Sequence, residues 1–126
     1  MVSKNNVLTS ILFVQYPKCS TCRKAKKWLD EHNIDYQSKH IVEDNPTADE
    51  LREWWEISDL PLKRFFNTSG MKYRELKLKD KLPEMSEDEQ LNILATDGML
   101  VKRPIIVDDD FVLVGFKVNQ WEEKLL

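Results

Sequence analysis

Two cysteines separated by two residues, Cys19 and Cys22, carry the clearest chemistry in this 126-residue chain, which has no other cysteine. Where such a pair occupies the first turn of a helix, the thiols lie close enough to form a disulfide with little backbone movement. At a helix N-terminus, unpaired N–H groups and the positive end of the helix dipole stabilise a thiolate, and this effect fades within one turn. Cys19 is therefore the expected nucleophile and Cys22 the expected resolving thiol.

Basic residues surround this pair, and no acidic residue occurs between Pro17 and Leu29. The cations near the thiols are Lys18, Arg23, Lys24, Lys26 and Lys27. Their charge should lower the pKa of Cys19 further, to an extent limited by the screening of exposed cations by salt. The predicted chemistry is thiol–disulfide exchange, in which Cys19 attacks an oxidised partner and Cys22 then releases the reduced product. This cycle needs no cofactor.

Two other interpretations of the cysteines stay open. Free cysteines often serve as small buried hydrophobic residues without any chemistry. A zinc site would need more ligands, and His32 and His40 are the only histidines. The resulting spacing, Cys-x2-Cys-x9-His-x7-His, matches no common zinc finger, so we predict no metal. The position of the pair between a strand and a helix favours redox chemistry.

The elements predicted around the pair place Cys19 at a strand-to-helix turn. A β-branched and aromatic run at 11–16, closed by a proline, fits a central strand covered on both faces. Apolar residues at helical spacing then predict a helix with Ser20 as a candidate N-cap and an end near 32–33. A second strand over 34–42 completes a strand-helix-strand unit, which suggests a parallel pair.

A mostly helical stretch, about 46–97, separates this unit from the last strands. Capping-box patterns at Thr47 and Ser86 each predict the start of a helix. The shorter elements expected are helices at 60–66 and 73–78, a loop at 67–70, strands at 105–107 and 111–115, and a helix at 118–125. We therefore expect an α/β fold in which helices pack on a mixed sheet of about four strands.

A basic pair and a proline, Lys102-Arg103-Pro104, directly precede the third predicted strand. The plain interpretation is the start of a strand fixed by Pro104. If this segment packs against the Cys19 turn, the planar guanidinium of Arg103 becomes a partner for a thiolate or a bound anion.

Length and charge limit the remaining possibilities. The chain fits one domain, 1–126, in which we expect residues 1–10 to form a flexible arm. It carries 19 basic and 22 acidic residues, a net charge of −3, so no overall positive field draws it to nucleic acid. The longest strongly apolar run, 11–14, is too short to cross a bilayer or to form the core of a signal peptide. We expect a cytoplasmic monomer that binds neither membranes nor nucleic acid directly.

Three segments resemble those of the arsenate reductase (ArsC) family, which includes Spx-like regulators of RNA polymerase. They are Tyr16-Pro17-Lys18-Cys19-Ser20-Thr21-Cys22-Arg23-Lys24-Ala25, Tyr73-Arg74-Glu75-Leu76 and Lys102-Arg103-Pro104-Ile105. The resemblance extends over nearly the whole chain after Ser10. It implies a thioredoxin-like, glutaredoxin-like fold with a helical insertion between the two halves of the sheet. It also implies a cis peptide bond before Pro104, facing the Cys19 turn.

Arsenate reductases of this family attack arsenate with one cysteine, which matches Cys19, and glutathione and glutaredoxin then reduce the product. They hold the oxyanion with arginines, one of which matches Arg103. Asn67 and a residue near Phe116 stand where the other two arginines are expected. Cys22 is instead shared with Spx-like members, in which the cysteine pair is a redox switch on a protein that binds the RNA polymerase α subunit.

The sequence thus predicts a thiol–disulfide oxidoreductase in which Cys19, Cys22 and Arg103 act in catalysis. Binding of the anion or partner is assigned to Ser20, Thr21, Arg23 and Pro104. The expected substrate is a small thiol or a protein disulfide, arsenate being disfavoured by the two missing arginines, and the expected reductant is glutathione, glutaredoxin or thioredoxin. The alternative is a redox-sensing regulator of the Spx type that binds the RNA polymerase α subunit and shows little or no turnover.

Overall fold

A four-stranded mixed sheet forms the centre of the structure, a computed structural model that describes residues 11–126. The strands are β1 (Leu12–Gln15), β2 (Gln37–His40), β3 (Ile105–Val107) and β4 (Val112–Val114). They lie in the order β2-β1-β3-β4; β2 is parallel to β1, β3 is antiparallel to β1, and β4 is antiparallel to β3. The arm predicted for residues 1–10 lies outside the described residues.

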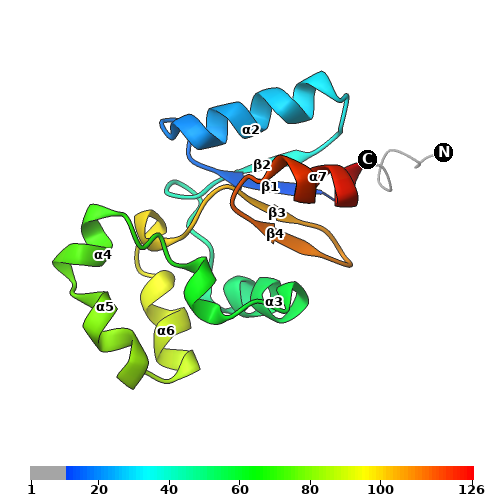
Figure 1. Ribbon diagram of the computed structural model, residues 1–126. Coiled ribbons are helices and arrows are strands. Elements are labelled where there is room, and N and C mark those ends of the chain that lie inside the picture. Colours follow the sequence, from blue (N-terminus) through cyan, green and yellow to red (C-terminus); the bar gives the residue numbers. More distant parts are fainter. Residues whose placement is uncertain (1–10) are drawn as a thin grey trace.

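Alternation of side chains along the strands gives the sheet two apolar faces. Phe13 and Ile106 pack on one face, Val14 and Ile105 on the other, and all four are fully buried. Three helices cover these faces (Figure 1): α2 (Ser20–Glu31) and α7 (Val118–Leu125) the first, α3 (Ala48–Ser58) the second. The prediction of a central strand covered on both faces is confirmed.

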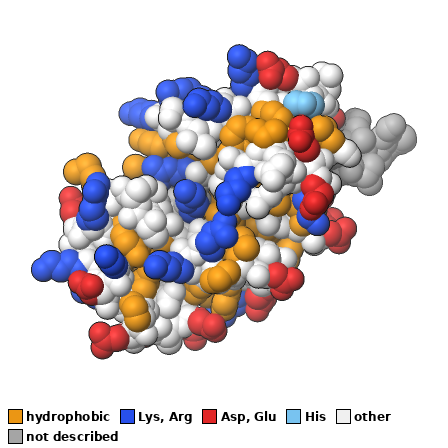
Figure 2. All heavy atoms as spheres, in the orientation of Figure 1, with side chains coloured by type: hydrophobic (Ala, Val, Ile, Leu, Met, Phe, Trp, Pro, Cys, Tyr) orange, Lys and Arg blue, Asp and Glu red, His pale blue; other side chains and the backbone are white. Residues whose placement is uncertain are grey.

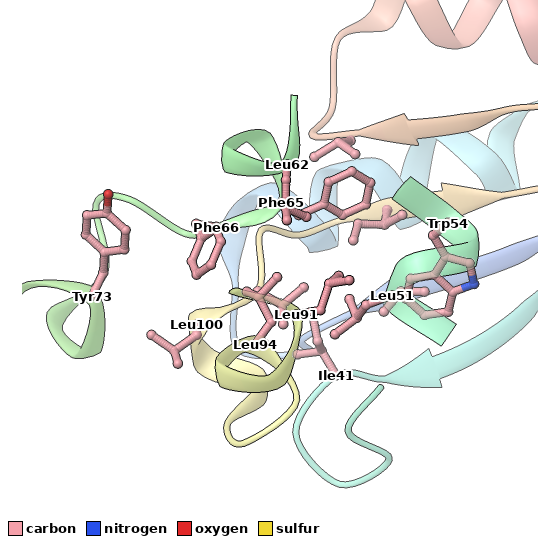
Figure 3. Close-up of a cluster of buried hydrophobic side chains, with 14 of the residues drawn as sticks. Ile41, Leu51, Trp54, Leu62, Phe65, Phe66, Tyr73, Leu91, Leu94 and Leu100 are labelled. Carbon is pink, nitrogen blue, oxygen red and sulfur yellow. The ribbon is translucent and has the colours of Figure 1, made fainter. Parts of the chain in front are cut away.

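Between β2 and β3 the chain forms a run of helices on the α3 side of the sheet (Figure 1). After α3 come η1 (Leu62–Phe65), α4 (Met71–Glu75), α5 (Leu78–Lys81), η2 (Leu82–Glu84), α6 (Glu87–Leu94) and η3 (Gly98–Leu100). Their apolar side chains form one cluster with those of the second face, as Figure 3 shows in part. Both predicted capping boxes are present, at Thr47 and Ser86. The thioredoxin-like α/β fold that the resemblance implied is thereby confirmed.

Three local predictions are wrong in detail. Ser20 is the first residue of α2 and not its N-cap, because Cys19 itself has the extended backbone conformation of the cap. The helix predicted over 73–78 is instead two short helices, because Lys77 has a left-handed conformation (φ 55°) and separates α4 from α5. Strand β2 spans only 37–40 of the predicted 34–42.

Close packing at Gly98 brings the end of the helical run against the sheet. A Cβ atom at this position would lie 1.9 Å from the carbonyl oxygen of Ile41, so only glycine fits. Just beyond η3, Val101 pairs with Phe66 in an isolated antiparallel bridge. Two main-chain hydrogen bonds of 2.8 Å flank this bridge. The segment before β3 is therefore held beside residues that precede it by about 35 positions.

Candidate functional site

The turn after β1 brings Cys19 to the N-terminus of α2. Its N–H donates to the carbonyl oxygen of Tyr16 at 2.9 Å, which closes the turn, and the helix begins at Ser20. Arg23 Nη1 donates to the carbonyl oxygen of Pro17 at 3.2 Å and braces the same turn. No acidic residue lies in the first turn of α2, so the positive end of its dipole acts on Cys19 without compensation.

Cys19 is a partly buried thiol whose pKa lies below its ordinary value. Burial works in the opposite direction and is the largest single influence on this pKa. It is outweighed by the backbone N–H and thiol of Cys22, the backbone N–H of Thr21 and the positive charge of Arg103. Cys19 therefore holds more thiolate near neutral pH than it would at its ordinary pKa.

Cys22 lies one turn further along, on the buried face of α2, with only 1% of its surface exposed. Burial raises the pKa of this thiol to about 12, and the neighbouring Cys19 adds to the rise. The Tyr16 N–H donates to Cys22 Sγ at 3.5 Å and acts against it. Both cysteines are free thiols in this structure. Their opposite pKa shifts mean that the accessible sulfur loses its proton at a lower pH than the buried one.

Arg103 enters the site from the segment before β3. Its Nη1 donates to the carbonyl oxygens of Met99 at 3.2 Å and Val101 at 3.3 Å. The guanidinium carbon lies 5.4 Å from the centroid of the Tyr16 ring, which is within the range of a cation–π contact. The peptide bond to Pro104 is cis, as the resemblance implied, and the proline is buried. The guanidinium is thus fixed by main-chain oxygens and an aromatic face.

A cleft of about 600 Å³ opens beside Cys19. Its near wall is the turn at 16–22, which contributes Cys19 and Thr21, and its far wall combines residues 67–75 with residues 97–103. Lys72 and Asp97 of the far wall form an ion pair at 3.9 Å.

Two further cations of the far wall, Lys102 and Arg103, form no ion pair within residues 11–126. Figure 2 shows lysine and arginine side chains over α2 and across the middle of one face, with most of the visible carboxylates nearer its rim. The charge around the thiols is therefore positive although the chain as a whole is acidic.

The structure gathers part of the predicted site at this cleft. The predicted residues that line it are Cys19, Thr21 and Arg103. Cys22 lies buried beside Cys19 on α2. Ser20 and Arg23 are exposed and do not line the cleft, and Pro104 is buried outside its lining.

Most of the far wall has no counterpart in the residues assigned from the sequence. The lining residues without an assigned role include Ser69, Gly70, Met71, Lys72, Asp97 and Met99. The pattern at 67–70 predicted only a loop, and the Asp97-Gly98 pattern predicted only the end of a helix. The bridge between Phe66 and Val101 brings these segments together, and no local sequence pattern signals such a long-range pairing. The resemblance pointed to the segment 67–75, through Asn67 and through Tyr73-Arg74-Glu75-Leu76.

The described residues offer a site built from sulfur and cationic groups. Among residues 11–126, no group of three or more histidine, cysteine or acidic side chains could hold a metal ion. In the same range, no helix combines the length and the apolar character needed to cross a membrane. The chemistry available at the cleft is that of a thiolate with a second thiol one helical turn away.

Comparisons with curated proteins agree with the motif at the site. The ArsC family matches residues 14–124. The uncharacterized protein YusI of Bacillus subtilis is 60% identical over 114 residues, which cover 90% of this chain and 97% of that protein. The global transcriptional regulator Spx 2 of Bacillus cereus is 32% identical over 102 residues, which cover 81% of this chain and 76% of the regulator.

Solved structures show the same relationship. A Bacteroides fragilis protein described as related to the ArsC family shares 59% identity and superposes with a TM-score of 0.89, covering 92% of this chain and 98% of its own. A Streptococcus mutans protein described as a possible arsenate reductase shares 46% identity with a TM-score of 0.82, covering 90% and 98%. On the match over residues 14–124 and these close relatives, the chain belongs to the ArsC family.

Proposed function

We propose that this chain is a thiol–disulfide oxidoreductase with Cys19 as nucleophile and Cys22 as resolving thiol. The observation that carries the proposal is the division of roles between the two sulfurs. Cys19 lies at an open cleft with a lowered pKa, whereas Cys22 is buried with a pKa raised to about 12. An accessible thiolate with a protonated thiol behind it is the arrangement that stepwise exchange needs.

In the first step, the Cys19 thiolate attacks one sulfur of a partner disulfide. A bond forms between Cys19 Sγ and that sulfur, the partner's S–S bond breaks, and the partner's second sulfur leaves as a thiolate that takes a proton from solvent. The start of α2 and the charge of Arg103 favour the ionised form of Cys19 that makes the attack.

In the second step, Cys22 attacks Cys19 Sγ and displaces the partner's remaining sulfur. The negative charge on Cys19 is one cause of the raised pKa of Cys22, and this charge disappears when the mixed disulfide forms. Cys22 can then release its proton to solvent, and the Tyr16 N–H at 3.5 Å supports the resulting thiolate. The partner has gained two electrons and the pair has become a disulfide. A thiol reductant such as glutathione, glutaredoxin or thioredoxin restores the dithiol.

Arsenate is a weaker candidate for the substrate than a disulfide. Of the three arginines that the resemblance expects, only Arg103 is present, and its Nη1 already donates to two main-chain oxygens. Asn67 lines the cleft but carries no charge. Phe116 packs against Trp121, with ring centroids 4.7 Å apart, and does not line the cleft. These three observations support a site built for sulfur exchange.

A second candidate function follows from the relative named as a global transcriptional regulator, which is 32% identical to this chain. In this alternative, oxidation of the Cys19–Cys22 pair controls binding to the RNA polymerase α subunit, and turnover is slow or absent. Either function places the chain in the cytoplasm, where thiols are kept reduced between cycles.

Two reduction assays run side by side test the proposal. Disulfide reduction is measured with insulin and a glutathione system, and arsenate reduction with glutathione and glutaredoxin. We expect turnover of the disulfide only, and Cys19→Ser should abolish it. Cys22→Ser should stop after the first step, so that intact-mass analysis finds a mixed disulfide at Cys19.

The same preparations distinguish the two functions. Absence of turnover in both assays, together with co-precipitation of the RNA polymerase α subunit from cell extract, would contradict the oxidoreductase function and support the regulatory one. Turnover of arsenate as fast as that of the disulfide would instead show that arsenate is a substrate, although two of the expected arginines are missing.

A further inference from the structure

Tyr16 contacts each of the three groups to which the proposed chemistry assigns a role. Its carbonyl oxygen accepts the Cys19 N–H at 2.9 Å, and its own N–H donates to Cys22 Sγ at 3.5 Å. Its ring lies 5.4 Å from the guanidinium carbon of Arg103. The two main-chain contacts exist for any residue at this position, so what is particular to tyrosine is the contact of its ring with Arg103.

The ring of Tyr16 is itself held in place. The imidazole of His40 packs edge-on against it, with ring centroids 5.8 Å apart and an interplanar angle of 83°. The imidazole is fixed in turn, because its Nδ1 accepts the N–H groups of Val42 at 3.1 Å and Glu43 at 3.0 Å. The aromatic surface offered to Arg103 therefore has a defined position.

Arg103 depends on this surface, because no carboxylate holds it among the described residues. Its remaining contacts are the donations from Nη1 to the carbonyl oxygens of Met99 and Val101. A carboxylate partner would neutralise the charge that favours the Cys19 thiolate. An aromatic face attracts a guanidinium through its quadrupole and adds no net negative charge.

We infer that Tyr16 is a positioning residue, whose aromatic ring holds the Arg103 guanidinium beside the Cys19 sulfur and leaves its positive charge available to the thiolate. The Tyr16 hydroxyl has no hydrogen-bond partner within residues 11–126, so the ring and not the hydroxyl carries the role. The inference rests on the proposed function for its purpose, and its measurement needs no substrate.

The test is the rate of alkylation of Cys19 by iodoacetamide as a function of pH, with circular dichroism as the check of folding. Tyr16→Leu should raise the pKa of Cys19 by roughly half or more of the rise seen in Arg103→Ala. Tyr16→Phe keeps the ring and should retain the native pKa. Tyr36→Leu is the matched control: the Tyr36 ring also packs edge-on against another ring, that of Phe13 with centroids 5.4 Å apart, but among the described residues no cation–π contact joins it to Arg103.

A double variant separates positioning from general loosening of the fold. In an Arg103→Ala background, Tyr16→Leu should cause no further rise in the pKa of Cys19, because the group that the ring positions is already gone. The inference is overturned if Tyr16→Leu has no effect, if its effect persists without Arg103, or if Tyr36→Leu has the same effect.

Should Tyr16→Leu fail to fold, a measurement on the native protein decides. The side-chain protons of Arg103 should resonate upfield in the NMR spectrum because of the Tyr16 ring current, and ordinary shifts for these protons overturn the inference. Failure of the proposed function gives a different pattern. In that case the alkylation series behaves as expected, but no disulfide is turned over.

Discussion

The two walls of the cleft differ in how the chain builds them. The near wall is one continuous turn, 16–22, closed by the 2.9 Å hydrogen bond from the Cys19 N–H to the Tyr16 carbonyl oxygen. The far wall joins two segments, 67–75 and 97–103, across an isolated bridge. The near wall holds both sulfurs, whereas the far wall holds the guanidinium of Arg103 and most of the lining.

This difference separates the reactive group from the groups that tune it. A strand, a tight turn and a helix suffice to place a thiol at a helix N-terminus. The tendency of Cys19 to ionise there therefore has a local origin. The charge and shape opposite the thiol depend on tertiary packing. Changes in the far wall should therefore alter the pKa of Cys19 and the choice of partner while leaving the cysteine pair in place.

The largest effect, a loss of folding stability, is expected from a substitution at Gly98, where the far wall meets the sheet. Gly98→Ala would place a Cβ atom 1.9 Å from the carbonyl oxygen of Ile41, and main chain must move to relieve this contact. We expect a loss of about 3 kcal/mol in the free energy of unfolding, measured by urea denaturation.

Gly70→Ala is the matched control for this change. The nearest atom to a Cβ at Gly70 is Nδ2 of Asn67 at 2.7 Å, the end of a side chain that can rotate away. We expect a loss of about 1 kcal/mol or less. Equal losses in the two variants would show that the close approach of Gly98 to Ile41 does not anchor the far wall.

The second effect compares the two cysteines through the pH dependence of stability. Cys22 has a pKa of about 12 in the folded protein, so it keeps its proton above pH ~8.5, where the unfolded thiol loses it. The stabilisation is complete below pH ~8.5 and is lost as pH rises toward 12, by up to about 1.4 kcal/mol per pH unit. Cys19 acts in the opposite sense: its lowered pKa contributes stability above pH ~8.5 that is lost as pH falls through its folded pKa.

Urea denaturation of the reduced protein at pH 8.5 and 10 measures the contribution of Cys22. Cys22→Ala should lose less stability between these two pH values than the native chain. In the native chain the Cys22 thiol ionises in the unfolded state but not in the folded state, and the variant has no such thiol, whereas lysines and tyrosines titrate in both proteins. The same loss in both proteins would mean that Cys22 does not hold its proton more strongly in the folded state.

The contrast between the walls also explains what the sequence could predict. The near wall was predicted almost completely because strand, turn, helix and cysteines follow one another within 11–31. Its one error, Ser20 as N-cap, arose because Cys19 itself occupies the cap, and cysteine is not among the usual capping residues.

Apart from Arg103, the far wall could not be predicted from local patterns. The close approach at Gly98 and the bridge between Phe66 and Val101 exist only after the sheet and the helical insertion have packed together. Lys77 shows the same limit inside the insertion, because its left-handed conformation has no glycine or asparagine to signal it. The cis bond before Pro104 was expected only from the resemblance.

The third effect is the influence of the far wall, through Arg103, on the pKa of Cys19 in the near wall. Arg103→Ala should raise the pKa of Cys19 and slow its alkylation at pH 7 by roughly three- to tenfold, because a positive charge that favours the thiolate is lost. Arg103→Lys keeps the charge without the planar donors and should have an intermediate effect.

Lys102→Ala provides a control within the same wall. Lys102 lines the cleft beside Arg103, but its charge is not among the causes that lower the pKa of Cys19. Its removal should change the alkylation rate by less than about twofold. A rate in Lys102→Ala as low as that in Arg103→Ala would assign the effect to the general positive field of the cleft.

The smallest effect is expected on arsenate binding, from adding to the far wall the arginine that the resemblance to arsenate reductases implies at position 67. Asn67→Arg places a second guanidinium in the lining of the cleft. It removes two weak side-chain contacts, from Asn67 Nδ2 to the carbonyl oxygen of Met99 at 3.5 Å and from Ser69 Oγ to Asn67 Oδ1 at 3.4 Å. The bond from the Asn67 N–H to the Leu100 carbonyl oxygen belongs to the main chain and stays. We expect the concentration of arsenate that protects Cys19 from alkylation to fall by roughly two- to fivefold.

Thr68→Arg adds the same charge one residue further along, at an exposed position that does not line the cleft. If the geometry of the lining matters, only Asn67→Arg should strengthen protection by arsenate, and higher salt should weaken protection in both variants because the ions screen exposed charges. Equal protection by the two variants would mean that net positive charge near the thiol, and not a guanidinium opposite it, governs anion binding. The far wall would then select partners by its field alone.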